Sequence, residues 1–292
     1  MRITDEIKAS FREGSTLSKL IYINLGIFVL IQATIIFMHL FGGNQYVYQM
    51  ISYLAVPTDG MRLITRPWTL ITYMFTHKDF FHILFNLLWL YWFGKIFLSY
   101  LTEKQLLSIY ILGGLAGALL YIVSFNLFPG LQEQVASSMA LGASASVMAI
   151  VIAIAVLVPD YKIYVIFIGP VKIIYVALVG FALSSLVDFS VNTGGKIAHI
   201  GGALMGYIFT LQYNKGKDIS MGISRFIDKI FHIFSSKKKM RVTHKKPSSD
   251  YEYNKQKAKN QQEMDRILDK ISKKGYESLT KEEKEILFKM GK

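Results

Sequence analysis

The 292-residue chain contains no cysteine. This absence excludes disulfides, thiolate metal sites and cysteine nucleophiles. Charged residues are also few, at 18 %, whereas hydrophobic residues make up 52 % of the chain. Several apolar runs approach or exceed the ~20 residues that a bilayer span requires. The composition therefore predicts a multi-pass membrane protein rather than a soluble globular one.

Six apolar segments divide the first two thirds of the chain. They lie at about residues 20–41, 79–99, 104–127, 142–158, 172–188 and 197–213. The first follows a basic segment, residues 1–19, and has no small-residue cleavage site after it, so we expect an uncleaved span rather than a signal peptide. The predicted fold is an all-α bundle of six transmembrane helices over residues 20–213.

Lysine and arginine in the short connections predict the orientation of the chain, because the cytoplasmic side carries more of them. The richer side holds Arg2, Lys8, Arg12, Lys19, Lys95, Lys104, Lys162 and Lys172, and the poorer side holds Arg62, Arg66, Lys78 and Lys196. Six spans return the chain to the side on which it began. We therefore expect both termini to be cytoplasmic, in a cell membrane and specifically the inner membrane of a bacterium.

Much of the formal net charge of +13 lies after residue 214. It predicts a basic tail outside the bilayer rather than a nucleic-acid-binding fold. Residues 214–262 are expected to form an amphipathic segment and a linker, the linker being the polar stretch 242–262. The amphipathic stripe consists of Ile223, Phe226, Ile227, Ile230 and Phe234, and Lys237-Lys238-Lys239 follows it. This pattern suits either an anionic membrane face or a solvated charged surface.

The last residues, 263–292, predict a small helical hairpin. Met264, Ile267, Leu268 and Ile271 fall at helical spacing, Gly275 ends that helix, and Thr280-x-x-Glu283 is a capping box for the next. A cytoplasmic partner is one possible role, and contact with substrate tails or with the membrane is another.

The sixth segment opens with Lys196-Ile197-Ala198-His199-Ile200-Gly201-Gly202, and Gly206 follows one turn later. An ionisable side chain in hydrocarbon is costly and is therefore a functional hypothesis by default. The spacing Gly202-x-x-x-Gly206 allows a second helix to approach the backbone closely. His199 is thus expected above a close helix contact.

Three segments bring polar side chains to one depth. The second, fourth and sixth segments enter the membrane from the outside, so their first residues share its outer third. Ser144 and His199 lie about two residues into their segments, and His82 and Asn86 about three and seven residues into theirs.

The chemistry of this set is that of acyl transfer. A histidine can take the serine hydroxyl proton and later protonate a leaving amine. His82 and Asn86, four residues apart on one helix face, can donate to the developing oxyanion, and the Ser144 N–H in the first turn can add a donor. No acidic residue completes a triad in the sixth segment, so a Ser144–His199 dyad is predicted, with no metal or cofactor.

Each of these residues also has a structural interpretation. Ser, His and Asn inside membranes often serve only as hydrogen-bonding contacts between helices. Ser146 is a rival nucleophile, but two residues turn a helix by about 200°, so Ser144 and Ser146 cannot both face His199. His77, beside Lys78, is interpreted as a positioning or surface residue.

At these residues the chain resembles the rhomboid family of intramembrane serine proteases, over roughly residues 60–210. The resemblance rests on His77 with His82-Ile83-Leu84-Phe85-Asn86, on Gly142-Ala143-Ser144, and on Ala198-His199-x-x-Gly202-x-x-x-Gly206, in the family's order. It implies that Ser144 is the nucleophile, His199 the general base, and His82 with Asn86 the oxyanion group. It also implies a water-filled cavity open to the outside, and single-pass membrane proteins as substrates.

Three positions depart from the family pattern. Ala145 stands where glycine usually follows the nucleophile, Thr69 stands where arginine usually follows the loop tryptophan, and Met148 replaces a tyrosine found in several members. None of these removes a reacting atom. The alternative to a protease is a catalytically inactive rhomboid-like protein that binds membrane clients. A transporter is disfavoured because the polar residues share one depth instead of lining a path through the midplane.

Overall fold

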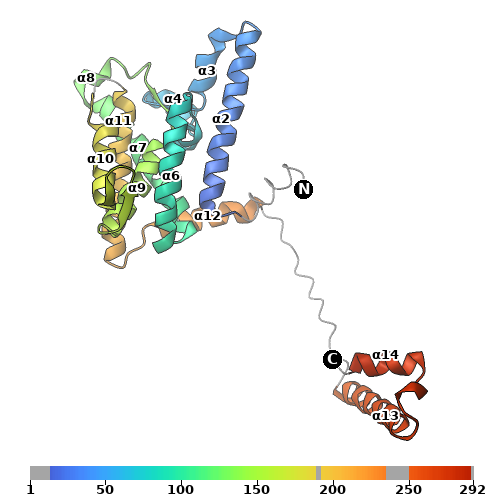
Figure 1. Ribbon diagram of the computed structural model, residues 1–292. Coiled ribbons are helices and arrows are strands. Elements are labelled where there is room, and N and C mark those ends of the chain that lie inside the picture. Colours follow the sequence, from blue (N-terminus) through green and yellow to red (C-terminus); the bar gives the residue numbers. More distant parts are fainter. Residues whose placement is uncertain (1–13, 189–191, 235–249, 291–292) are drawn as a thin grey trace. The chain divides into compact units, whose positions relative to one another are not determined.

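The computed structural model describes residues 14–188, 192–234 and 250–290. It divides into two units, residues 1–234 and 235–292. Figure 1 shows the first as a group of long helices drawn from blue to orange, and the second as a red pair of helices. Each unit is described by itself.

Six long helices account for most of the first unit, and successive helices run in opposite directions (Figure 1). They are α2 (Thr16–Leu40), α6 (Phe80–Tyr100), α7 (Glu103–Leu127), α9 (Ser144–Leu157), α10 (Ile173–Ser185) and α11 (Thr193–Asn214). A helix thus occupies each apolar segment found in the sequence. The helices α6, α9 and α11 begin at one end of the unit, called here the upper end, and α2, α7 and α10 begin at the lower end.

Three of these helices, α2, α6 and α7, are long and apolar enough to cross a membrane. The apolar helices α9 and α10 have only 14 and 13 residues. At about 1.5 Å per residue they reach about 20 Å, which is less than the ~30 Å of a bilayer's hydrocarbon layer. Length and composition therefore support three spans, and the predicted count of six also requires α9, α10 and the 22-residue α11 to lie in the membrane.

Side chains at the helix ends explain where several helices begin. The Ser15 hydroxyl accepts a hydrogen bond from the Ser18 N–H at the start of α2, and Thr102 and Gln105 form a capping box at the start of α7. Asn192 caps α11 from a left-handed conformation, at φ 54°. Because asparagine tolerates that conformation better than most residues, α11 begins at Thr193, four residues before the predicted start.

The centre of the unit is α9, of whose 14 residues 11 are buried. It packs between α7 and α11 at near-backbone distance. A Cβ on Gly206 of α11 would lie 2.2 Å from the Ala149 carbonyl oxygen, and one on Gly113 of α7 would lie 2.3 Å from the Ala149 Cβ. The glycine spacing of α11 predicted a close contact with a second helix, and the structure shows that this helix is α9. The equivalent role of the α7 glycines was not predicted.

The connection between α2 and α6 is built from short elements: η1 (Asn44–Tyr46), α3 (Val47–Ser52), β1 (Val56–Pro57), α4 (Gly60–Thr65), α5 (Thr69–Thr72) and η2 (Tyr73–Phe75). After α7 come α8 (Pro129–Gln132) and β2 (Met139–Ala140). β1 and β2 pair antiparallel, with Val56 opposite Ala140. This pairing holds the first connection against the residues that lead into α9.

At the lower end, β3 (Lys162–Val165) and β4 (Gly169–Lys172) form an antiparallel hairpin between α9 and α10. The predicted amphipathic segment forms α12 (Ser220–Phe234). Its Asp228 carboxylate lies 2.8 Å from Lys104 Nζ at the start of α7, and the Ser224 and Ser108 hydroxyls are 2.9 Å apart. Of the predicted stripe, Ile223 and Ile227 are half-buried and Phe226 is exposed. The side chains of Ile230 and Phe234 and the basic cluster 237–239 lie outside the described residues.

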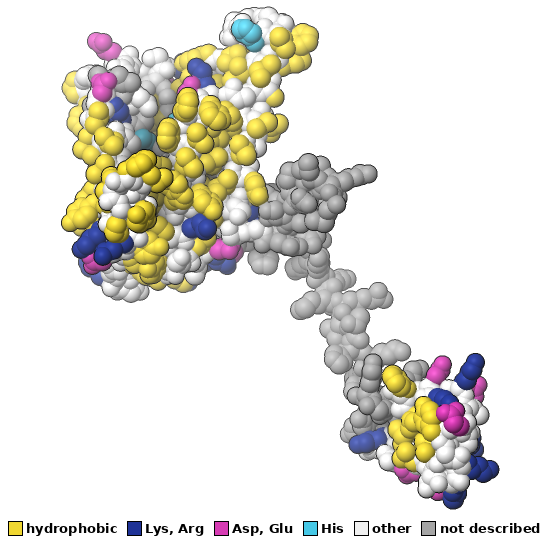
Figure 2. All heavy atoms as spheres, viewed as in Figure 1, with side chains coloured by type: hydrophobic (Ala, Val, Ile, Leu, Met, Phe, Trp, Pro, Cys, Tyr) yellow, Lys and Arg dark blue, Asp and Glu magenta, His cyan; other side chains and the backbone are white. Residues whose placement is uncertain are grey.

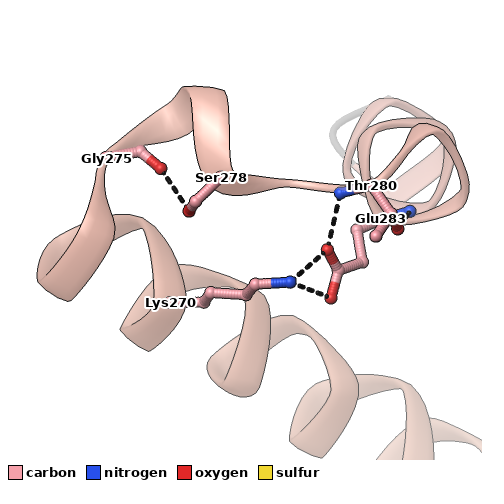
Figure 3. A network of polar contacts seen from close by, with 5 residues as sticks. All are labelled: Lys270, Gly275, Ser278, Thr280 and Glu283. Atoms are coloured by element: carbon pink, nitrogen blue, oxygen red, sulfur yellow. Dashed lines mark hydrogen bonds and ion pairs between the residues drawn. The ribbon is translucent and has the colours of Figure 1, made fainter.

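The second unit contains α13 (Asp250–Lys274), η3 (Tyr276–Ser278) and α14 (Lys281–Met290). Figure 3 shows the contacts between its helices: Lys270 Nζ donates to both carboxylate oxygens of Glu283, at 2.9 and 2.7 Å, and Glu283 also accepts from the Thr280 N–H at 2.8 Å. The predicted hairpin is present, but α13 begins at Asp250, inside the stretch 242–262 that was interpreted as a linker. Lys, Gln, Glu and Ala are good helix formers, so the low hydrophobicity of this stretch did not exclude a helix.

Candidate active site

The loop before α9 holds Ser144 at the upper end of the unit. Gly142 has φ 119°, a conformation that favours glycine, and its N–H donates to the Tyr73 carbonyl at 2.9 Å. A Cβ on Gly142 would lie 2.7 Å from His82 Cε1, so the His82 ring of α6 lies directly against this loop. Ser144 is half-buried and is the first residue of α9, where its N–H has no acceptor within the helix.

His77 also holds this loop. The Ala143 N–H donates to His77 Nε2 at 3.2 Å, and the His77 ring is fully buried. Its position in the connection before α6 therefore supports the positioning interpretation and excludes the surface one. Burial, followed by the nearby His82 ring, lowers the pKa of His77 to about 4. His77 is thus a neutral ring whose unprotonated Nε2 holds the residue before Ser144.

His82 and Asn86 lie on one face of α6, one turn apart. The Asn86 amide donates to the His82 carbonyl at 2.8 Å, and its Nδ2 lies 3.4 Å from His77 Nε2. The His77 and His82 rings meet edge to face with centroids 5.2 Å apart. The two predicted oxyanion donors therefore belong to one connected group with His77, facing the Gly142–Ser144 loop.

The packing of α11 against α9 brings His199 to the same place. A Cβ on Gly202 would lie 2.1 Å from the Ala145 carbonyl oxygen. Ser144 is the residue before Ala145, and His199 lies one turn before Gly202. His199 Nδ1 lies 3.2 Å from the Ser184 carbonyl oxygen of α10. As the carbonyl can only accept, Nδ1 carries the proton, which leaves Nε2 as the basic nitrogen.

Within the described residues, the Ser144 hydroxyl makes no hydrogen bond, and the His199 ring makes only the one to Ser184. The structure thus brings both predicted dyad residues to one region without a direct bond between them. A backbone carbonyl occupies the orienting position that a carboxylate occupies in a catalytic triad.

Ser146, the rival nucleophile, faces away from this region. A Cβ on Gly114 of α7 would lie 2.7 Å from Ser146 Oγ, and this hydroxyl is buried without a partner in the described part of the chain. The side chain therefore points to α7, on another face of α9 from the contact with α11. This agrees with the angle of about 200° between Ser144 and Ser146.

A further residue near the site, Lys196, was not predicted to have the role that the structure gives it. Lys196 is buried at the start of α11, and its Nζ donates to the carbonyl oxygens of Val187, at 2.5 Å, and Asp188. It joins the end of α10 to the turn that precedes His199. Sequence analysis counted Lys196 only among the charged residues of the connections. Its position three residues before an intramembrane histidine could have indicated a role beside the site.

The departure at Thr69, in the first connection, also has a structural explanation. The Arg66 guanidinium lies 3.8 Å from the centroid of the Tyr53 ring, and Trp68 Nε1 donates to the Tyr53 carbonyl at 2.9 Å. Thr69 is buried and donates to the Arg66 carbonyl at 2.7 Å. Arg66 and Trp68 together hold the first connection to Tyr53, without an arginine at position 69.

Two family models match the chain. The model of the rhomboid domain matches residues 65–215, and a model described as a family of unknown function, DUF6576, matches residues 248–291. A curated relative, the RHOMBOID-like protein 12 of Arabidopsis thaliana, described as mitochondrial, is 29 % identical over 159 residues. That alignment covers 51 % of this chain and 47 % of the relative, so the chain spans about half the length of the relative that it matches.

The rhomboid match covers more than half of the chain and contains every residue of the candidate site. The chain therefore belongs to the rhomboid family of membrane proteins.

Proposed function

We propose that this protein is an intramembrane serine endopeptidase in which Ser144 is the nucleophile and His199 the general base. The observation that carries the proposal is the contact of α9 with α11. Because Gly202 has no side chain, the Ala145 carbonyl lies against its backbone, which brings the turn bearing His199 beside Ser144. The Ser184 carbonyl then selects the tautomer in which Nε2 can accept a proton.

The proposed reaction follows from these roles. Ser144 Oγ attacks the carbonyl carbon of a peptide bond while its proton passes to His199 Nε2. The C–N bond breaks as His199 returns that proton to the leaving amine. A water molecule, deprotonated by the same nitrogen, then hydrolyses the ester and restores the Ser144 hydroxyl.

The tetrahedral oxyanion requires donors close to Ser144. The His82 ring lies against Gly142, and we assign it one hydrogen bond to the oxyanion. The Asn86 amide uses one N–H for the His82 carbonyl, and its second N–H, which lies near His77 Nε2 at 3.4 Å, turns to the oxyanion when that forms. The Ser144 N–H, at the first residue of α9, is the third donor. His77 supports the group by holding Ala143.

The short length of α9 is consistent with a site below the membrane surface. Non-helical backbone is tolerated at membrane depth where protein surrounds it, and the Gly142–Ala143 loop is buried. On this basis all six long helices lie at membrane depth, with both termini cytoplasmic and the site open to the outside through water. The proposed substrates are transmembrane proteins, cut where small or helix-breaking residues expose a carbonyl.

The test is cleavage of a generic single-pass membrane protein by the purified chain in liposomes. Wild type and Ser146→Ala are expected to cleave it, whereas Ser144→Ala and His199→Ala lose cleavage. Ser146→Ala is the matched control, because it also removes a serine hydroxyl from the first turn of α9, but on the face that points to α7. Loss of activity in Ser146→Ala with retention in Ser144→Ala would refute the assigned nucleophile.

The second candidate is an inactive rhomboid-like protein that binds membrane clients. It is favoured by one observation, the absence of a hydrogen bond from the described Ser144 hydroxyl to His199. Under this alternative, folded wild type cleaves none of several substrates, and Ser144→Ala captures the same intact clients as wild type.

A further inference from the structure

The β3–β4 hairpin ends in an apolar tip with little protein around it. Ile166, Phe167 and Ile168 are 74 %, 103 % and 75 % exposed, and Tyr164 next to them is 78 % exposed. Phe167 sits in the left-handed region at φ 69°. Three consecutive large apolar side chains at a loop tip are unfavourable in water. The tip therefore requires an apolar partner.

The base of the hairpin has a different chemistry. Lys162 and Lys172 face each other across the two strands, and Lys172 Nζ lies 2.6 Å from Asp160 Oδ1. Beside them, the Tyr100 and Tyr161 rings meet edge to face at 6.3 Å. Tyrosine and lysine are the residues that anchor membrane proteins at the headgroup level. The base thus has the composition of the membrane–water interface.

The length of the hairpin fits one leaflet. Each strand has four residues, which at ~3.3 Å per residue gives roughly 13 Å from base to tip. Half of a bilayer's hydrocarbon layer is about 15 Å thick. With the base among the headgroups, the tip lies in the acyl chains of the same leaflet.

The backbone of the hairpin has one outward donor fewer than a hairpin without proline would have. The Ile173 N–H donates to the Tyr161 carbonyl, so these two residues form a hydrogen-bonded pair. Along the hairpin such pairs alternate with pairs whose backbone N–H and C=O groups point away from the partner strand, and these outward pairs are Lys162–Lys172 and Tyr164–Pro170. Pro170 has no N–H, so this outward pair near the tip carries one donor, the Tyr164 N–H, instead of two. The other outward pair, of lysines, lies at the base.

The surface around the lower end likewise combines apolar side chains with a basic border. Figure 2 shows Lys and Arg side chains in dark blue along the lower edge of the first unit, below a mainly yellow, apolar surface. On α12, bound to the start of α7 at this end, Phe226 is also exposed, at 60 %. The hairpin is thus one part of a wider apolar and basic boundary.

We propose that the β3–β4 hairpin inserts its Ile166–Ile168 tip into the acyl layer of a phospholipid leaflet and holds Lys162 and Lys172 among the headgroups. Its partner is the lipid surface itself. The inference does not depend on the proposed catalytic activity, because it concerns only how the lower end of the unit contacts the bilayer.

The absence of cysteine makes the test specific, because a single introduced cysteine is the only one to be labelled. A nitroxide is attached to Phe167→Cys in the full chain, in liposomes of phosphatidylcholine and phosphatidylglycerol. Its collision rates with oxygen, which concentrates in acyl chains, and with a water-soluble nickel chelate are measured. Leu30→Cys, at an exposed position of α2, is the lipid reference, and Glu285→Cys, exposed on α14, is the aqueous reference.

At position 167 the oxygen-to-nickel collision ratio is expected to match that at Leu30 and to exceed that at Glu285 several-fold. A ratio equal to that at Glu285 would place the tip in water and overturn the proposal. Low collision rates with both reagents would overturn it in favour of a protein contact, such as a second copy of the chain. Because the Phe167 side chain is fully exposed, its replacement removes no packing contact that folding needs.

Discussion

The helices α9 and α10 are both short and apolar, yet they are packed in opposite ways. In α9, 11 of 14 residues are buried, whereas in α10 only Ile173, Ala177 and Ser185 are. Exposed side chains of α10 include Tyr175, Leu178, Val179 and Leu183. The first helix carries the candidate nucleophile Ser144, and the second contributes a backbone carbonyl, that of Ser184, to the candidate base.

The difference extends to what each helix touches most closely. Gly206 of α11 approaches the α9 backbone at the Ala149 carbonyl, whereas Gly180 of α10 approaches the end of the Trp89 side chain of α6. A side chain can change rotamer, but a helical backbone cannot move without its whole helix. We infer that the position of Ser144 is rigidly determined, whereas α10 can shift and adjust the orientation of His199.

The largest effect is expected from Gly206→Ala. The added Cβ would lie 2.2 Å from the Ala149 carbonyl oxygen, so α11 must move away from α9. Overpacking against backbone is expected to lower the free energy of unfolding by about 3 kcal/mol and to displace His199. Thermal unfolding in detergent measures the loss, with Gly26→Ala, which meets nothing within 4 Å, as the control. Equal stability of the two variants would contradict the rigid contact.

His77→Ala is expected to have the next largest effect, because it leaves the buried Ala143 N–H without its acceptor. The loss is about 2 kcal/mol. The matched control is His39→Ala, at an exposed position. The same unfolding measurement is used, and a loss no greater than that of the control would show that His77 does not hold the loop before α9.

The lowered pKa of His77 also predicts how the stability of the protein changes with pH. Its pKa in the folded protein is about 4, below the ordinary value of 6.5, so the unfolded state binds more protons between these values. Its contribution to stability is therefore complete above pH 6.5 and is lost as pH falls toward 4. Unfolding of wild type should be more acid-sensitive in this interval than that of His77→Ala. Parallel pH profiles would argue against a neutral, buried His77.

The smallest effect is expected from Gly180→Ala. Its Cβ would lie 2.1 Å from Trp89 Cη2, as short a distance as at Gly206, but the obstacle is the far end of a side chain. Trp89 can turn aside, so the free energy of unfolding should change by less than about 1 kcal/mol. A loss as large as that of Gly206→Ala would show that α10 is as rigidly packed as α9.

Much of the site was predictable because it depends on local spacing. His82 and Asn86 share a helix face at any four-residue separation, and Ser144 and Ser146 must diverge on one helix. The positions of the apolar segments likewise indicated six helices. The start of α13 was not predictable from hydrophobicity, because a solvated helix needs no apolar residues over its first turns.

The amino-acid sequence by itself determined the apolar segments, the small residues that allow α9 and α11 to touch, and the order of the polar residues along the chain. Only the tertiary structure decided that His77 is buried against Ala143, that Lys196 closes the end of α10, and that the Ser184 carbonyl orients His199. The physical reason is that each of these bonds joins a side chain to a backbone group of another segment. Every residue offers the same backbone N–H or carbonyl, proline's missing N–H aside, so no sequence pattern identifies the partner, and the packing of the helices selects it.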